Sequence, residues 1–229
     1  TPERVWQEVE KTLSAANPEI FFHVLNEIGY WHIYATRPDG NIEPIGDKGP
    51  RLDLKDETRR VIDILAQVTN NRDFANFSAY LESLHKAESY YRGYRWGFFL
   101  FNNPNLAPNN EINSLAVFNG VIPYSRIFGE DYYGLMFFRQ NWNDSTTFMN
   151  YKAGDTFTHH GHYDSGHFSM FKGAPLIVNS SEYGKYTGEN RLNYAIRTIS
   201  KNSIVIQKPL EEIKPNRFFK DNVADGGQR

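Results

Sequence analysis

The sequence predicts an α+β protein in which a helical region precedes an antiparallel β region. Up to about residue 100, apolar residues recur at the spacing of amphipathic helices. After about residue 111 the chain has short apolar or alternating runs separated by turn residues, as in an antiparallel sheet. The Asn- and Pro-rich stretch 102–110 lies between them and is typical of a connecting loop. We therefore expect two domains, over residues 1–102 and 111–229.

The helical region is expected to contain helices joined by loops and packed antiparallel. Thr1 and Pro2 favour a helix start at the beginning of the sequence. Arg37-Pro38-Asp39-Gly40 has the composition of a turn, and the loop that it opens continues to Pro50. The predicted helices span residues 2–14, 18–35, 55–70 and 74–90.

The β region is divided by turns such as Gly129-Glu130-Asp131 and Lys172-Gly173-Ala174-Pro175. The runs between these turns are short enough for strands of an antiparallel sheet. The predicted strands span residues 114–118, 124–128, 133–139, 145–152, 156–164, 167–172, 175–179 and 203–207.

The composition narrows the function classes. A net charge of −2 over 229 residues gives no basic field for nucleic acid, and no apolar run is long enough to span a bilayer. There are no cysteines, so disulfides and thiolate zinc sites are excluded. The 14 Tyr and 17 Phe are weak evidence for a glycan-handling surface, because sugar rings stack on aromatic faces.

The segment 154–171 carries the clearest functional signal, because it holds four of the seven histidines. Imidazole titrates near neutral pH and is the commonest metal ligand. On an extended strand His160, His162 and Asp164 would share one face, and His159 would point the opposite way. His167 follows Gly166, where a bulge is expected. Two interpretations stay open: a strand that presents His160 and His162 to a cleft, or a hydrogen-bonded histidine cluster at a sheet edge.

Several motifs resemble those of heparinase II/III-type polysaccharide lyases. The Arg37–Gly40 turn followed by Ile45-Gly46-Asp47 is similar to a loop of that family. HHGHYDSGHFSMFKGAPLIVNSSEYG (159–184), NYAIRTISKNS (193–203) and DGGQR (225–229) resemble later segments in the same order. The resemblance implies an incomplete α/α toroid followed by an antiparallel β-sandwich. Residues 1–102 would be the C-terminal part of the toroid, and residues 111–229 the first part of the sandwich. Because family members are considerably longer, we expect this chain to be one section of a larger polypeptide.

The resemblance implies β-elimination on a polysaccharide that contains uronic acid. Such an enzyme must neutralise a carboxylate, remove the proton at C5 and protonate the leaving oxygen, and histidine and tyrosine suit the proton transfers. On this basis His160 and Tyr194 are the expected catalytic residues. His159, Tyr183 and Arg197 are expected to bind substrate. Each Tyr or Arg also has an ordinary structural explanation, as a buried hydroxyl or a surface ion pair.

The resemblance also implies a zinc site, with His162 and Asn179 among its ligands. Lys201 stands where the family has a third ligand, a histidine. Asn can donate a carbonyl oxygen, but a protonated Lys cannot ligate and would repel a cation. We therefore expect tight zinc binding to be lost. Either the Lys201 ammonium replaces the charge of the metal, or the site is degenerate.

Two other functions stay open: a metal-dependent oxygenase or hydrolase that uses His160, His162 and Asp164, and a non-catalytic glycan-binding module. The expected partners are an acidic polysaccharide and the rest of the same polypeptide, with no organic cofactor, nucleic acid or membrane, and with the oligomeric state left open. The resemblance implies a periplasmic or secreted location, although no signal peptide opens this sequence.

Overall fold

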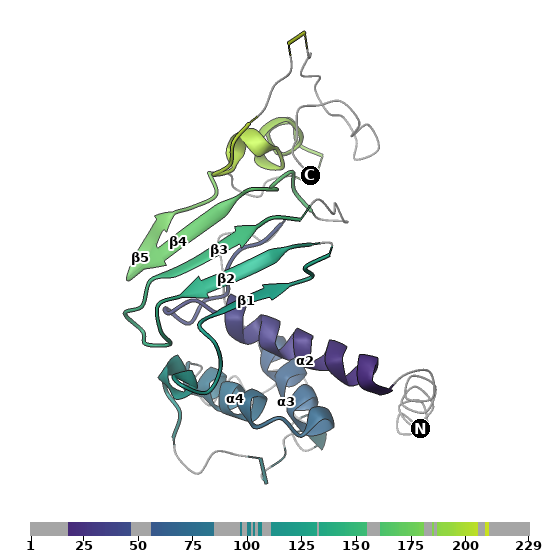
Figure 1. Cartoon of the computed structure of the whole chain (residues 1–229), viewed down its shortest axis with the longest axis vertical. Coiled ribbons are helices and arrows are strands. Elements are labelled where there is room, and N and C mark those ends of the chain that lie inside the picture. Colours follow the sequence, from purple (N-terminus) through teal and green to yellow (C-terminus); the bar gives the residue numbers. More distant parts are fainter. Residues whose placement is uncertain are drawn as a thin grey trace. The chain divides into compact units, whose positions relative to one another are not determined.

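A computed structural model of the chain describes residues 18–46, 56–84, 111–131, 133–154, 161–180, 187–205 and a few isolated positions between them and at 209–210. The chain divides into two compact units. One comprises Thr1–Ile33 and Lys55–Asn113, and the other Tyr34–Leu54 and Ser114–Arg229. The first unit is helical and the second contains a five-stranded antiparallel sheet (Figure 1), so the predicted α+β class is confirmed. The toroid and the sandwich stay predictions.

Three helices of the helical unit have described bounds: α2 (Pro18–Ala35), α3 (Asp56–Thr69) and α4 (Arg72–Leu84). The last two residues of α2 belong to the other unit. The helices predicted over 18–35 and 55–70 are confirmed. The helix predicted over 74–90 is confirmed to Leu84, and the one predicted over 2–14 lies outside the described residues.

Close packing joins α2 to α4. A Cβ atom added at Gly29 would lie 2.3 Å from the ring of Phe74, so only glycine permits this approach. Next to it the rings of Tyr30 and Phe74 meet edge to face, 5.1 Å apart. The Tyr30 hydroxyl donates a hydrogen bond of 2.9 Å to Asp73 in the first turn of α4.

The sheet is a meander in which consecutive strands pair antiparallel in the order β1-β2-β3-β4-β5 (Figure 1). Each strand falls within or next to a predicted run. The strands are β1 (Ser125–Phe128), β2 (Leu135–Arg139), β3 (Phe148–Lys152), β4 (Phe168–Lys172) and β5 (Ala174–Ile177).

Three of the predicted strands differ from the structure. Leu115–Phe118 forms a 3₁₀ helix, because the Ser114 hydroxyl caps it by accepting a hydrogen bond from the Ala116 amide. Residues 161–164, the described part of the strand predicted over 156–164, form no strand and lead into a turn at Gly166, where φ is +80°. Residues 203–205 are likewise not in a strand.

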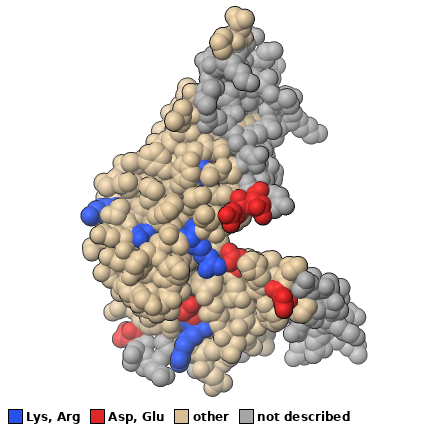
Figure 2. Space-filling view, in the orientation of Figure 1, with Lys and Arg blue, Asp and Glu red and all other residues tan. Residues whose placement is uncertain are grey.

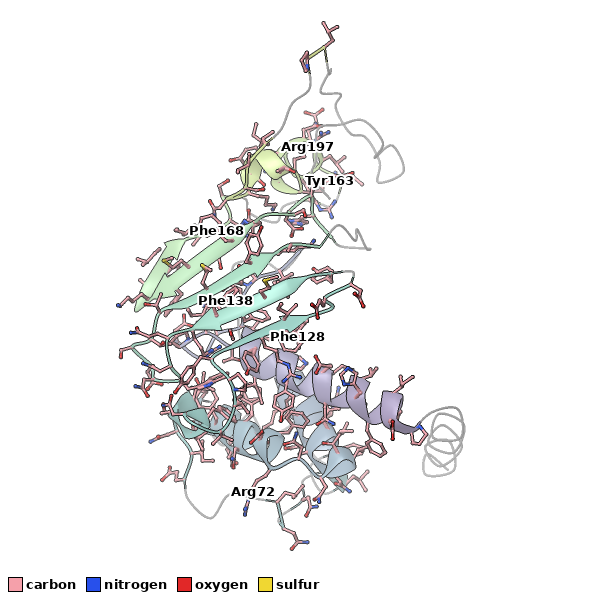
Figure 3. The ribbon with its side chains drawn as sticks, in the orientation of Figure 1. Arg72, Phe128, Phe138, Tyr163, Phe168 and Arg197 are labelled. Atoms are coloured by element: carbon pink, nitrogen blue, oxygen red, sulfur yellow. The ribbon has the colours of Figure 1, made fainter. Side chains whose placement is uncertain are left out.

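The two faces of the sheet differ in burial. One face is only partly covered and carries all three methionines together with Phe138 and Phe168 (Figure 3). The other face is buried, but it mixes apolar and polar side chains. Its buried members on the three central strands are Leu135, Phe137, Arg139, Phe148, Asn150, Lys152, Ser169 and Phe171.

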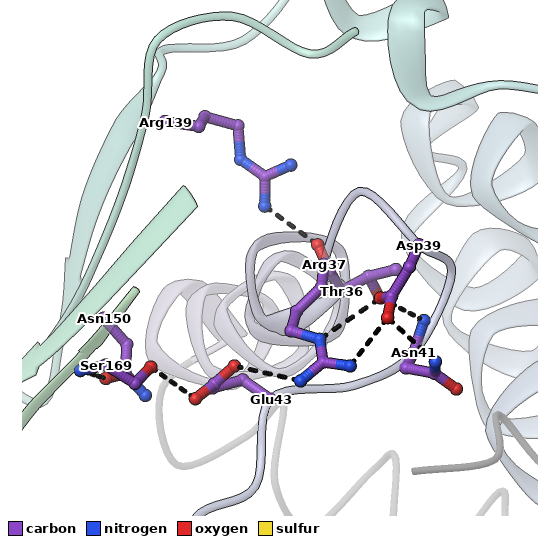
Figure 4. A network of polar contacts seen from close by, with 8 residues as sticks. All are labelled: Thr36, Arg37, Asp39, Asn41, Glu43, Arg139, Asn150 and Ser169. Atoms are coloured by element: carbon purple, nitrogen blue, oxygen red, sulfur yellow. Dashed lines mark hydrogen bonds and ion pairs between the residues drawn. The ribbon is translucent and has the colours of Figure 1, made fainter. Parts of the chain in front are cut away.

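The loop that follows α2 lies in the same unit as the sheet and supplies hydrogen-bond partners for Arg139 and Ser169 on the buried face (Figure 4). Arg139 donates to the carbonyl oxygens of Tyr34 and Thr36 at 2.9 and 3.0 Å, and its guanidinium lies 3.8 Å from the centre of the Trp142 ring. The Ser169 hydroxyl donates to Glu43 at 2.5 Å. These bonds tie the loop to β2 and β4.

We expect Arg139→Met to lower the free energy of unfolding by about 2–4 kcal/mol, because two buried carbonyl oxygens lose their donor. Urea denaturation followed by circular dichroism measures the change. Arg126→Met on β1 is the matched control and should cost less than about 1 kcal/mol, because this side chain is partly exposed. Equal losses in the two variants would contradict the role given to Arg139.

Glu43 should make stability fall as pH rises. Burial raises the pKa of this carboxyl group to about 7, although the Ser169 hydroxyl and Arg37 favour its ionised form; Asp39 adds a smaller repulsion. Because the folded pKa exceeds the usual 4.5, this contribution is complete below pH 4.5 and is lost as pH rises through 7. Urea denaturation at several pH values should show wild type losing on the order of 3 kcal/mol relative to Glu43→Gln across this range. A pH-independent difference would refute the assignment.

Candidate functional site

A small pocket in the sheet-containing unit is lined by residues of β2, β3 and four loop segments, and several of their side chains are titratable. Its volume of about 20 Å³ suits one water molecule or a single ion and is too small for a sugar ring. The loop at Pro44–Gly46 forms part of its wall. The polar residues that line it are Asn150, Lys152, His162, Asp164, His167, Asn179 and Lys201.

Lys201 is 8% exposed, and its ammonium group has three acceptors. It lies 2.9 Å from Nδ1 of His162, 3.2 Å from Oδ1 of Asn179 and 2.8 Å from the carbonyl oxygen of Ala195. The structure therefore brings together the three residues that stand at the zinc position implied by the family resemblance. The Lys201 ammonium nitrogen contacts the two residues that would be the zinc ligands.

A second ammonium group enters the pocket from β3. Lys152 forms a buried salt bridge with Asp164 and lies 4.6 Å from the centre of the Tyr133 ring. Burial, together with the nearby Asp164 charge, raises the pKa of Tyr133 to about 12. Lys152 is thus paired with a carboxylate, whereas the Lys201 contacts described above are with neutral acceptors.

His167 is held as a neutral ring between these two cations. Its Nδ1 accepts a hydrogen bond of 3.1 Å from the Asn202 amide. Burial lowers the pKa of His167 to about 4; the neighbouring Lys201, His162 and Lys152 act in the same direction, while Asp164 opposes them. The ring therefore serves as an acceptor at neutral pH.

Tyr194 lies on a π-helical turn, η3 (Arg191–Ala195). It is 38% exposed, and its hydroxyl lies 3.0 Å from the hydroxyl of Ser180. Lys201 contacts Asn179, the residue before Ser180, and Ala195, the residue after Tyr194. The positions of the Tyr194 phenol and the Lys201 ammonium therefore both depend on the segments 179–180 and 194–195.

Arg197 is 4% exposed, and its Nε donates to the Leu192 carbonyl oxygen at 3.0 Å. The adjacent Thr198 hydroxyl donates to the carbonyl oxygen of Tyr163, and Tyr163 lies near Arg197 in Figure 3. In this arrangement Arg197 braces the 191–200 segment. Its predicted contact with substrate stays a prediction. His159, His160 and Tyr183 lie outside the described residues.

Lys152 and Asn150, which line the pocket, were not identified from the sequence, and neither was Glu43, which is hydrogen-bonded to Ser169 on the same sheet. The signal for the first two is the alternation in Phe148-Met149-Asn150-Tyr151-Lys152, which puts both polar side chains on the face of Phe148. A polar residue at a core position of a strand needs a buried partner. For Glu43, which lies in a loop, no comparable pattern exists.

The donor set fits a metal ion poorly. Among the described residues, no group of three or more His, Cys, Asp or Glu side chains is arranged to hold one. His162 and Asn179 already accept from an ammonium group, and Asp164 is paired with Lys152. Zinc would have to enter between positive charges, which repel it strongly where water is scarce.

No family model matches the chain. It is 59% identical over 27 residues to a multifunctional CCA protein from Tolumonas auensis, covering 12% of this chain and 7% of that protein. It is 33% identical over 96 residues to another from Mannheimia succiniciproducens, covering 38% and 22%. The chain thus spans less than a quarter of either curated relative. These matches do not assign the chain to a family.

Among solved structures, the fold is similar to a heparan sulfate lyase from Pedobacter heparinus, with 19% identity and a TM-score of 0.43 over 72% of this chain and 21% of that one. A heparinase III structure gives 19% identity and a TM-score of 0.45 over 74% and 22%. Similarity at this level carries no argument about function. The resemblance seen in the sequence motifs stays a prediction.

On the face shown in Figure 2, basic and acidic side chains lie in small separate groups among other residues, so the described atoms there form no continuous basic surface. None of the helices over the described part of the chain is both long and apolar enough to cross a membrane.

His167 should make stability rise with pH, opposite to Glu43. Its folded pKa of about 4 lies below the ordinary 6.5, so its contribution is complete above pH 6.5 and is lost as pH falls toward 4. Relative to His167→Gln, wild type should gain stability between these pH values, with a slope approaching one proton per chain. Urea denaturation across the range measures it. A pH-independent difference would show that the ring is protonated alike in the folded and unfolded states.

Proposed function

We propose that this chain is a section of a polysaccharide lyase that cleaves uronic-acid-containing glycans by β-elimination. The observation that carries the proposal is the contact between the Lys201 ammonium and the His162 imidazole, with an exposed phenol held by a residue next to one of their partners. Lys201 contacts His162, Asn179 and Ala195, and the Tyr194 hydroxyl lies 3.0 Å from the hydroxyl of Ser180, the residue after Asn179. These are the kinds of group that the elimination needs for charge neutralisation and proton transfer.

In this proposal the buried cations act on the substrate electrostatically. Removing the C5 proton of a uronate places further negative charge next to a carboxylate, so fixed positive charge lowers the barrier. Because the pocket holds only a water-sized group, the sugar would bind outside it. His160 and Tyr194 would carry out the proton transfers, and His159 and Tyr183 would contact the glycan. A periplasmic or secreted location would suit this substrate.

The contacts of the two lysines make a metal-dependent oxygenase or hydrolase a poorer explanation of the site. That function needs His160, His162 and Asp164 as ligands, but His162 contacts the Lys201 ammonium and Asp164 is paired with Lys152. A glycan-binding module without catalysis differs from the lyase only in turnover. Incubating the chain, and the full reading frame that contains it, with a panel of uronate polysaccharides separates the two. Ultraviolet absorbance of an unsaturated uronate product supports the lyase, and binding without product supports the module.

His160→Ala, introduced into the full reading frame, should lower the elimination rate by about 10²–10⁴, the usual contribution of a positioned acid or base. The melting temperature should change little. His23→Ala on the exposed side of α2 is the matched control and should keep the wild-type rate. The initial rate of absorbance increase is the measurement. Wild-type turnover in the His160 variant would remove this residue from the catalytic assignment.

A further inference from the structure

The Lys201 ammonium contacts three acceptors among the described residues. The His162 ring nitrogen, the Asn179 amide oxygen and the Ala195 carbonyl oxygen lie 2.8–3.2 Å from Nζ. These are ordinary hydrogen-bond distances. A zinc ion would require its nitrogen ligand at about 2.0–2.1 Å, so the three acceptors are spaced for an ammonium group.

The backbone that carries Lys201 is fixed on both sides. Its amide donates to the Thr198 carbonyl oxygen at 2.9 Å, closing the 3₁₀ turn η4 (Thr198–Ser200). The next residue, Asn202, donates through Nδ2 to the carbonyl oxygens of Phe168 and Val178 at 3.0 and 2.8 Å. The side chain is buried along its length, so the position of the ammonium follows from that of the backbone.

We propose that Lys201 supplies a built-in cation at this site, held covalently at the place where a metal ion would otherwise be gathered by the same acceptors. The positive charge then comes from the chain itself, whatever reaction the site supports. A covalently held cation makes the site independent of metal supply and of chelators.

A second consequence concerns His162. Because Lys201 donates to Nδ1, a neutral His162 ring must carry its proton on Nε2. Lys201 thus selects one tautomer, and His162 becomes a hydrogen-bond donor at Nε2. In this role Lys201 is a positioning residue for His162.

Metal content and thermal melting test the inference without any activity assay. Wild-type chain equilibrated with zinc and then freed of loose ions should hold well below one zinc per chain, and its melting temperature should be the same with zinc or with EDTA. Lys201→His should take up close to one zinc per chain and melt higher with zinc. Lys172→His, at an exposed position at the end of β4, is the control and should show neither effect.

Lys201→Met should lower the melting temperature by on the order of 5 °C, because three buried acceptors lose their donors. Lys172→Met should leave it unchanged. In wild type, the nitrogen chemical shifts of His162 should report protonation at Nε2, a measurement that needs no variant to fold.

Four results would overturn the proposal. They are close to one zinc per wild-type chain that is lost in His162→Ala, no zinc uptake by a folded Lys201→His variant, wild-type melting of Lys201→Met, and a proton on Nδ1 of His162 in the wild-type chain.

Discussion

Burial of cations on and around one face of the sheet determines how the rest of that unit is arranged. An uncompensated buried charge is very costly, so each cation must find acceptors close by. Arg139 donates hydrogen bonds to carbonyl oxygens at the end of α2, and Lys152 forms a salt bridge with Asp164. Lys201 donates to His162 and Asn179. The loops that supply these acceptors have little regular structure of their own. They are held against the sheet by the charges that they neutralise or solvate.

This constraint explains which parts of the structure could be predicted from the sequence. Local patterns identified α2 and α3, and the runs around all five strands, because their apolar spacing is decided within each segment. The strand predicted over 114–118 was wrong because the Ser114 side chain can cap a 3₁₀ turn, which competes with extended structure. The partners of buried charges lie far apart in sequence: Ser169 and Glu43 are separated by 126 positions. Such pairs cannot be read from local periodicity.

In the candidate site too, some features could be predicted from the sequence and others could not. The expectation that His162 and Asp164 share one face rested on a strand, and the described residues 161–164 form none. Both side chains nevertheless line the same pocket, each held by a different lysine. His162 and Asp164 are thus close together as expected, but a loop and not a strand brings them there. Lys201 could be singled out only because it replaces a histidine expected from the family resemblance. No family motif marked the position of Lys152.

In the proposed lyase, the size of the pocket would limit how its residues act on a substrate. A cavity of about 20 Å³ admits a water molecule, so Lys152 and Lys201 would not contact a sugar within it. They would act through the electric field and through the groups that they orient. Fields of buried charges are weakly screened because little water intervenes. Tyr194 is exposed and precedes Ala195, whose carbonyl oxygen accepts from Lys201, so in the proposed lyase it would connect this buried charge to a ligand at the surface.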